Sequence, residues 1–83
     1  MFYDVEIIRD LLNAGFSDED LNTFCFDHYR DVYNKFASQM SRASKIQLLI
    51  EYCERYIKFD ELLTQVKQIN PKQYDKFMPH LWW

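Results

Sequence analysis

Three chemically reactive side chains lie within four residues of the chain: the thiol of Cys25, the carboxylate of Asp27 and the imidazole of His28. A nucleophile, a base and an orienting acid are the groups that cysteine-dependent enzymes use. On a helix, however, Asp27 lies two positions from Cys25 and points to nearly the opposite side. Cys25 and His28 share their side with Leu21 and Phe24, at helical spacing. The pattern therefore favours a buried cysteine and a histidine at a helix end over a catalytic pair.

The charges near Cys25 lead to the same interpretation. A reactive thiolate needs an electropositive and partly open setting. The neighbouring charged side chains are instead carboxylates, at Asp18, Glu19, Asp20 and Asp27. The first three stand at an expected helix start, where the helix dipole favours acidic residues. We therefore expect Cys25 to be structural and the chain not to be an enzyme.

The sequence contains no pattern typical of a metal or cofactor site. Cys25, His28, Cys53 and His80 are potential zinc ligands, but no pair of them has zinc-ligand spacing on a turn. A glycine-rich phosphate loop and the G-x-S-x-G and H-E-x-x-H motifs are also missing. We expect no metal, cofactor or small-molecule substrate. Two cysteines outside any C-x-x-C pair indicate free, buried thiols in a reducing cytoplasm.

The elements that hold these residues are expected to be helices. The 83 residues include one glycine and two prolines, while hydrophobic residues make up 48%. Sheets with many tight turns need more glycine and proline, so the composition predicts an all-α fold. The chain is expected to be one domain over residues 1–83, a compact antiparallel six-helix bundle with a tail at 79–83. It has no apolar run long enough for a membrane span and no signal-peptide pattern.

Capping residues predict where the helices begin and end. The expected helices cover residues 4–13, 17–28, 30–35, 45–57, 60–69 and 71–77. The expected N-caps are Asp4, Ser17, either Ser41 or Ser44, Asp60 and Asn70, the last followed by Pro71 at the first helical position. Gly15 is positioned to end the first helix. The fourth helix has an apolar stripe that runs to Ile57, so we expect it to be the central, most buried one.

Charge is distributed unevenly along the chain, which predicts two surfaces of opposite sign. Residues 1–31 carry eight acids and two bases, and residues 32–83 carry five acids and eight bases, for a total of -3. The candidate acidic face consists of Asp18, Glu19, Asp20 and Asp27. The candidate basic face consists of Arg42, Lys45, Arg55 and Lys58. Exposed members of Phe26, Tyr29 and Tyr33 are candidate anchors for a partner.

Several short sequence segments, in a fixed order, resemble a known family. They are Phe16-Ser17-Asp18-Glu19 with Leu21, Cys25-Phe26-Asp27, Val32-Tyr33, Lys45-Ile46, Asp60-Glu61-Leu62-Leu63, and Asn70-Pro71 with Tyr74. In this order and spacing, the chain is similar to the bacterial effector-associated domains of the seventh type, within the death-like superfamily. The family pattern often has a glycine between the fourth and fifth helices, where this chain has Tyr56, Ile57 and Lys58.

The resemblance implies a death-like six-helix bundle without catalysis of its own. Such domains are adaptors that recruit effectors in bacterial conflict and immune signalling, by association with another domain of the same kind. The expected partner is another such domain, on the same or a different chain, or a second copy of this one; no nucleic acid and no membrane is expected. The resemblance leaves open whether the domain is free-standing or part of a longer effector.

A helical nucleic-acid-binding domain is the alternative. Its support is the basic bias of the second half, carried by Arg42, Lys45, Arg55, Lys58, Lys67, Lys72 and Lys76. The acidic total opposes it, because phosphate binding needs a positive surface. In the tail, Leu81, Trp82 and Trp83 either cover the core or form an aromatic contact patch.

Overall fold

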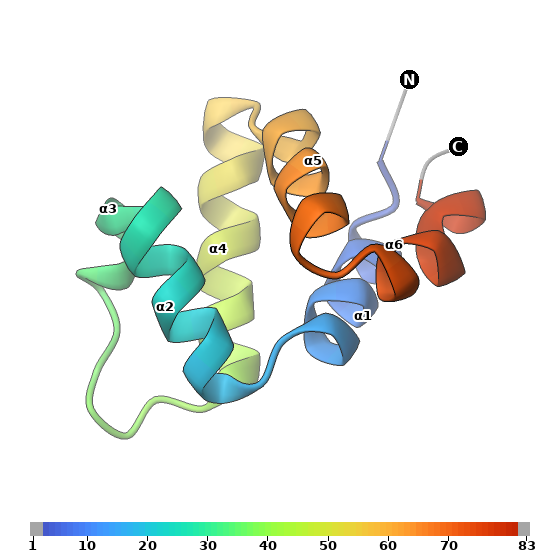
Figure 1. Cartoon of the computed structure of the whole chain (residues 1–83). Helices are drawn as coiled ribbons and strands as arrows, with labels where there is room; N and C mark the ends of the chain where they lie inside the picture. Colours follow the sequence, from blue (N-terminus) through green and yellow to red (C-terminus); the bar gives the residue numbers. More distant parts are fainter. Residues whose placement is uncertain (1–2, 82–83) are drawn as a thin grey trace.

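The computed structural model describes residues 3–81, and over these residues the chain is a bundle of helices. They are α1 (Val5–Gly15), α2 (Asp18–His28), α3 (Arg30–Tyr33), α4 (Arg42–Tyr56), α5 (Phe59–Ile69) and α6 (Pro71–Phe77), followed by a short 3-10 helix, η1 (Met78–His80). The expected all-α six-helix bundle is confirmed (Figure 1).

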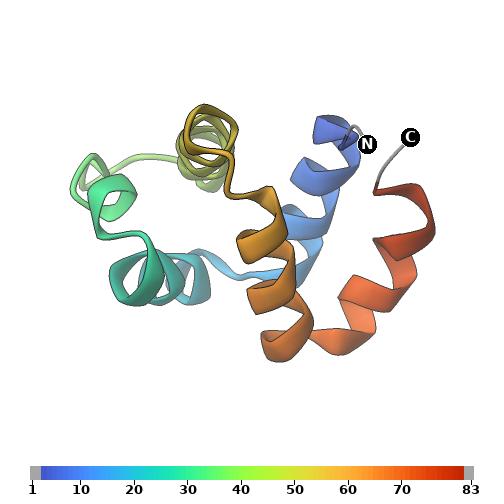
Figure 2. The ribbon, with the colours of Figure 1, turned by 90° about the horizontal axis from the view of Figure 1, so that it is seen from above.

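Helix α4 is the centre of the arrangement, as its sequence predicts. It packs against α1, α2, α3 and α5, and the molecule measures 35 × 25 × 19 Å. Seen from above, α2 and α3 lie on one side of α4, and α6 lies at the far side beyond α5 and α1 (Figure 2). The α5 helix runs back alongside α4, so the connection between them is a sharp reversal (Figure 1).

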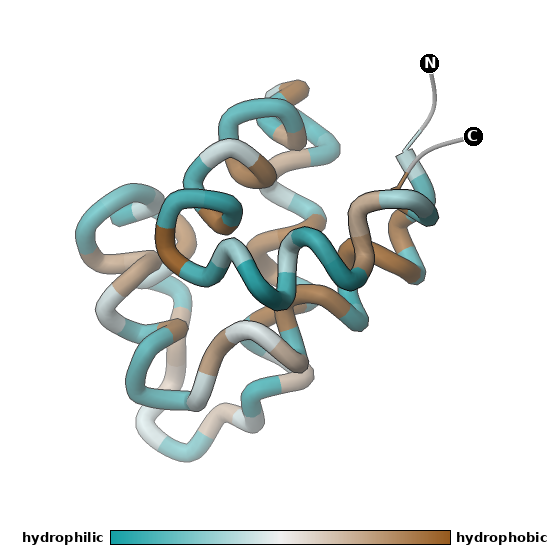
Figure 3. The backbone as a smooth tube through the Cα atoms, turned by 45° about the vertical axis from the view of Figure 1, so that its right-hand side comes forward, coloured by the Kyte–Doolittle hydropathy of each residue, from teal (hydrophilic) through white to brown (hydrophobic). Residues whose placement is uncertain are grey.

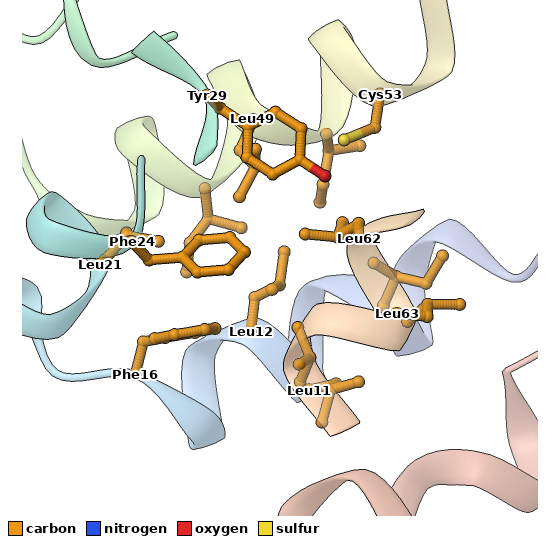
Figure 4. Packing of buried hydrophobic residues seen from close by; sticks show 14 of the residues in the cluster. Leu11, Leu12, Phe16, Leu21, Phe24, Tyr29, Leu49, Cys53, Leu62 and Leu63 are labelled. Atoms are coloured by element: carbon orange, nitrogen blue, oxygen red, sulfur yellow. The ribbon is translucent and has the colours of Figure 1, made fainter. Parts of the chain in front are cut away.

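A single hydrophobic core joins the helices. Hydrophobic and hydrophilic residues are interspersed along the helices (Figure 3), and α1, α2, α4 and α5 supply most of the buried ones. In the core, Leu12, Leu49 and Leu62 are completely buried and approach one another from three helices (Figure 4). Each such side chain contributes roughly 1.5 to 3 kcal/mol by its removal from water. This core fixes the positions of the surface residues considered below.

Four of the expected capping residues begin helices in the structure. Asp4 accepts from the backbone N–H groups of Glu6 and Ile7, and Ser17 accepts from that of Asp20. The other two caps are Ser41, which accepts from Ser44, and Asn70, which accepts from Gln73. Of the two candidates for α4, the structure therefore uses Ser41, and the helix begins at Arg42 rather than at residue 45.

The expected cap at Asp60 is wrong. Helix α5 begins at Phe59, and its N-cap, Lys58, makes no side-chain capping bond. The reason is the reversal after α4: the N–H of Lys58 donates to the carbonyl of Cys53 at 2.8 Å, so the chain enters α5 within two residues. Asp60 therefore lies in the first turn of α5.

Ile57 was expected on the buried stripe of the fourth helix, and this expectation is wrong too. The helix ends at Tyr56, and Ile57 caps it with left-handed backbone angles, φ 56° and ψ 55°. Its side chain is 90% exposed. A left-handed residue turns the chain out of the helix axis, so the helical spacing of the stripe stops one residue earlier than expected. This is the place where the resembling family often has glycine.

The smaller differences concern helix lengths. α1 continues to Gly15 and α3 ends at Tyr33 rather than at residue 35. Gly15 does not end α1 through a left-handed conformation, because it has no positive φ. Its carbonyl instead accepts from the side-chain amide of Asn70 at 3.2 Å, which links α1 to the start of α6.

The two ends of the described chain meet. Leu81 is fully buried in the core, and its carbonyl accepts from the N–H of Asp4 at 2.7 Å. Of the two alternatives for the tail, Leu81 covers the core, while Trp82 and Trp83 lie outside the described residues. Between residues 3 and 81, none of the helices combines the length and the apolar character that crossing a membrane requires.

Candidate interaction surface

The three reactive groups of the 25–28 segment are separated by the fold. Cys25 is completely buried, whereas Asp27 and His28 are exposed at the end of α2. The His28 ring packs on Phe24, with 5.1 Å between ring centres, and its Nδ1 lies 3.4 Å from the amide nitrogen of Gln65. Burial raises the pKa of the Cys25 thiol to about 12, and the nearby Cys53 adds to this rise. The Cys25 thiol is therefore neutral at physiological pH, and a neutral thiol is a poor nucleophile.

Cys53 resembles Cys25 in its burial and in its raised pKa. It is completely buried, and burial raises its pKa to about 12. The predicted burial of both cysteines is confirmed, and both are free thiols. Nearby, burial also raises the pKa of the Tyr29 hydroxyl, which lies 3.4 Å from Glu61 (Figure 4 shows Tyr29 and Cys53 facing the core). Within residues 3–81, no cluster of three or more His, Cys, Asp or Glu side chains could hold a metal ion.

The structure brings one residue of each predicted charged face into contact. Lys45 is 6% exposed, and its Nζ lies 3.2 Å from Asp18 Oδ1. Lys45 lies on the inner side of α4, four residues before the buried Leu49, and its Nζ is 5.4 Å from the centre of the Phe36 ring. Lys45 was expected on an exposed basic face, and this placement is wrong. A cation so buried is held by its carboxylate partner, so Asp18 and Lys45 link α2 to α4 within one molecule.

The three other carboxylates of the acidic face remain free. Glu19, Asp20 and Asp27 are exposed and form no ion pair with any other residue between 3 and 81. They line a hollow of about 370 Å³ between α2 and the end of α5. Its apolar lining consists of the buried Phe16 and Phe24 and the half-exposed Ile69. The rest of the lining is Gly15, Thr23, His28 and Asn70. We call this feature, with its three carboxylates and three apolar side chains, the acidic hollow.

The basic face is smaller than expected. The Arg42 guanidinium donates to the backbone carbonyl of Phe16 at 3.1 Å, so it supports the α1–α2 connection. Lys58 lies 3.5 Å from Glu61, in a pair whose two side chains are 38% and 51% exposed. Arg55 is exposed and has no ion-pair partner in the described part of the chain. The accessible cations of the predicted face are therefore Arg55 and Lys58, on either side of Tyr56 and Ile57.

The three candidate aromatic anchors differ in their exposure to solvent. Tyr29 is 3% exposed and belongs to the core. Phe26 is 44% exposed, with the Arg30 guanidinium 3.7 Å from its ring centre and Tyr33 against its edge. Phe26 is thus the available anchor, and Tyr33 is half-buried beside it.

Sequence reasoning missed the most exposed apolar residue of the described chain, Ile57, and the apolar rim residue Ile69. Helical spacing placed Ile57 on the buried stripe of the fourth helix. For Ile57 the sequence did contain one signal. The resembling family often has glycine at this place, and glycine is the usual residue where the backbone is left-handed. We call residues 55–58 the α4–α5 turn.

A second hollow, of about 410 Å³, lies between α3 and α4, and its charged lining is mixed, with Asp31, Lys35, Glu51 and Arg55.

Comparison with known proteins places most of this structure in one family. A family model described as effector-associated domain 7 matches residues 8–71, from α1 to the first residue of α6. No curated protein and no solved structure matches the chain. The matched range contains the acidic hollow and the α4–α5 turn.

Proposed function

Because the chain belongs to the effector-associated domain 7 family, we propose that it is a non-catalytic adaptor that recruits an effector by binding another domain of its own, death-like kind. The process would be bacterial conflict or immune signalling in the cytoplasm. The observation that carries the proposal is the acidic hollow, whose lining includes three carboxylates without ion-pair partners among the described residues and the half-exposed Ile69. Polar and charged groups beside an accessible apolar side chain are typical of the rim of a protein contact surface.

The state of the reactive groups supports a role without catalysis. The Cys25 thiol is enclosed in the core with a pKa raised to about 12, so it is neither accessible nor ionised at pH 7. The accessible chemistry of α2 consists of carboxylates and His28. Carboxylates at an interface rim act mainly on the rate of association and on the choice of partner.

The test is binding to other domains of the same family before and after charge reversal. The variant Glu19→Lys/Asp20→Lys/Asp27→Lys should bind a cognate domain at least tenfold more weakly at low salt, as measured by biolayer interferometry. Asp18 is left unchanged because it pairs with the buried Lys45. The matched control is Glu6→Lys/Asp10→Lys/Asp75→Lys, which reverses three exposed carboxylates outside the hollow and should leave the affinity unchanged.

Restoration on the partner would identify the contact. Reversal of the partner domain's accessible basic residues to Glu should recover part of the affinity for the Lys variant. If the triple reversal leaves binding unchanged at low salt, the acidic hollow is not the contact surface. If no domain of the family binds the unmodified chain, the adaptor function itself is overturned.

Nucleic-acid binding is the second candidate, and one local feature favours it. On α5 and α6, Lys67 lies 5.6 Å from the ring centre of Tyr74, and Lys76 lies 6.0 Å from that of Phe77. Cations beside aromatic rings are typical of single-strand binding surfaces. The net charge of -3 opposes this function. Binding to single-stranded DNA that weakens steeply between low and physiological salt would support it.

A further inference from the structure

Helix α4 has a second apolar stripe on its outer side, in addition to the one in the core. The stripe lines the second hollow, at an edge of the molecule where no described helix covers α4 (Figure 2). It consists of Leu48 and Tyr52, which are half-buried, and Tyr56, which is 55% exposed. These residues repeat every four positions, so they lie along one side of the helix. Accessible tyrosine and leucine side chains of this kind are typical of a contact surface.

Four charged side chains surround this stripe, and their charges sum to zero. Asp31 and Lys35 belong to the α3 side of the second hollow, and Glu51 and Arg55 belong to α4. All four are exposed, and none of them forms an ion pair with another residue between 3 and 81. Each side of the hollow thus offers one acid and one base. The partner that complements it carries both signs.

Glu51 and Arg55 are one helical turn apart, a spacing at which an ion pair within the helix is possible. In the structure Glu51 Oε1 instead accepts from Gln47 Nε2 at 3.1 Å, on the preceding turn and away from Arg55. Both charges are therefore available to a second molecule. Glu54, the other carboxylate of α4, is two positions from Tyr52 and points to the opposite side of the helix. It adds no charge to the stripe.

An acid and a base at this spacing are complementary to a second copy of themselves. When two α4 helices lie antiparallel across a two-fold axis, Glu51 of each copy faces Arg55 of the other, so the same ion pair forms twice. Tyr52 lies between the two charges in the sequence, which brings it near the axis, beside its counterpart. The two apolar stripes then cover each other. Such an isologous contact closes on itself and stops at two copies.

We propose that the outer side of α4 is a dimerisation surface, on which two copies of this chain meet in an antiparallel α4–α4 contact. The second hollow and the acidic hollow have no lining residue in common, so the dimer does not depend on the proposed function. If the proposed function holds, the dimer is a bivalent adaptor, because each copy keeps its own acidic hollow. Two linked contacts bind clustered effectors more tightly than one.

The experiment measures the molar mass of the 83-residue chain by sedimentation equilibrium, over a range of concentrations at low salt. One side of one helix is a small contact, so we expect a weak dimer whose fraction rises with concentration, and no larger species. Glu51→Arg and Arg55→Glu each place like charges opposite one another twice, so each should weaken the dimer by roughly tenfold or more. The matched control, Glu54→Arg, makes the same charge change on the opposite side of α4 and should leave the dimer unchanged.

Mixing the two variants separates this contact from a general effect of charge. The Glu51→Arg chain carries two bases at the contact and the Arg55→Glu chain carries two acids, so both ion pairs form again between unlike chains. The mixture should therefore contain a 1:1 heterodimer. The exchange Glu51→Arg/Arg55→Glu within one chain should also restore the dimer, without any change in net charge. Circular dichroism checks that each variant is folded, and the exchange variant keeps the test valid if a single variant is not.

The inference is overturned if the unmodified chain is monomeric throughout or forms species larger than a dimer. It is equally overturned if Glu54→Arg weakens the dimer as much as Glu51→Arg does, or if neither the mixture nor the exchange variant dimerises. The binding assay of the proposed function changes only residues of the acidic hollow. Its result is therefore independent of the dimer, and either proposal can fail without the other.

Discussion

At the scale of single residues, burial and backbone conformation change what a side chain can do. Cys25 resembles part of a catalytic group in the sequence, but its place on one helical stripe with Leu21 and Phe24 indicated burial, and the structure confirms it. Lys45 shows the limit of that reasoning. A lysine is rarely buried unless it is paired, and its partner, Asp18, is 27 positions away. Local spacing does not contain that information.

The buried thiols predict a loss of stability at alkaline pH. In the folded state the pKa of each thiol is raised from 9.0 to about 12, so above pH 9 the unfolded chain releases protons first. The free energy of unfolding should therefore be unaffected by the thiols below pH 9 and should decrease as the pH rises from 9 towards 12. At pH 10 each thiol should account for a decrease of about 1 kcal/mol.

Urea denaturation at pH 8 and pH 10 checks this prediction. Cys25→Ala and Cys53→Ala should each start about 1–2 kcal/mol less stable because of a small cavity. Each variant should then lose about 1 kcal/mol less than the unmodified chain between the two pH values. An equal loss in all three proteins would mean that the thiols ionise within the folded state.

The strained residue predicts a stabilising substitution. Ile57→Gly removes an unfavourable left-handed conformation that costs roughly 1–2 kcal/mol. It also gives the unfolded chain more freedom, which costs about 0.4–1 kcal/mol. The free energy of unfolding should rise by roughly 0.5–1 kcal/mol, as measured by the denaturation midpoint. Tyr56→Gly is the control: it places glycine inside the last turn of α4 and should lose about 1 kcal/mol.

At the scale of helices, most of the fold could be predicted because caps and apolar spacing are local signals. Asp4, Ser17, Ser41 and Asn70 begin helices where the sequence indicates. The largest failure lies at the α4–α5 turn, and smaller ones concern the end of α1, the end of α3 and the start of α4. At the α4–α5 turn the chain reverses through Ile57, which has a left-handed backbone. Sequence signals for helix ends rely on residues that favour such a conformation, and isoleucine does not. The same turn carries the surface that sequence analysis did not find.

Two substitutions test this difference between a capping residue and a first-turn residue. Ser17→Ala removes a bond to the N–H of Asp20 and should lower the free energy of unfolding by about 1 kcal/mol. Asp60→Ala removes only a charge near the start of α5 and should cost about 0.3 kcal/mol. Equal losses, measured by urea denaturation, would show that Asp60 acts as a cap after all.

At the scale of the whole molecule, the sequence predicted a charge difference but not its geometry. The acidic face is present in reduced form as Glu19, Asp20 and Asp27, because Asp18 is paired internally. Arg42 likewise contacts the carbonyl of Phe16, 26 positions away. Such long-range pairs depend on how α2 and α4 pack, and the packing is decided by the core. The remaining cations, Arg55 and Lys58, surround the exposed Ile57 rather than forming a continuous surface.

The bond between the Asp4 N–H and the Leu81 carbonyl makes the path of the chain almost a closed circle. If residues 4 and 81 were joined, the chain could be opened at another loop and the helices would keep the same cyclic order. A peptide linker that joins Asp4 to Leu81 would leave the helix packing in place and would restrict only the unfolded chain, by on the order of 4 kcal/mol for a loop of this length. New ends at the exposed Ser38, between α3 and α4, would give a cyclic permutation of the same helices around the same core.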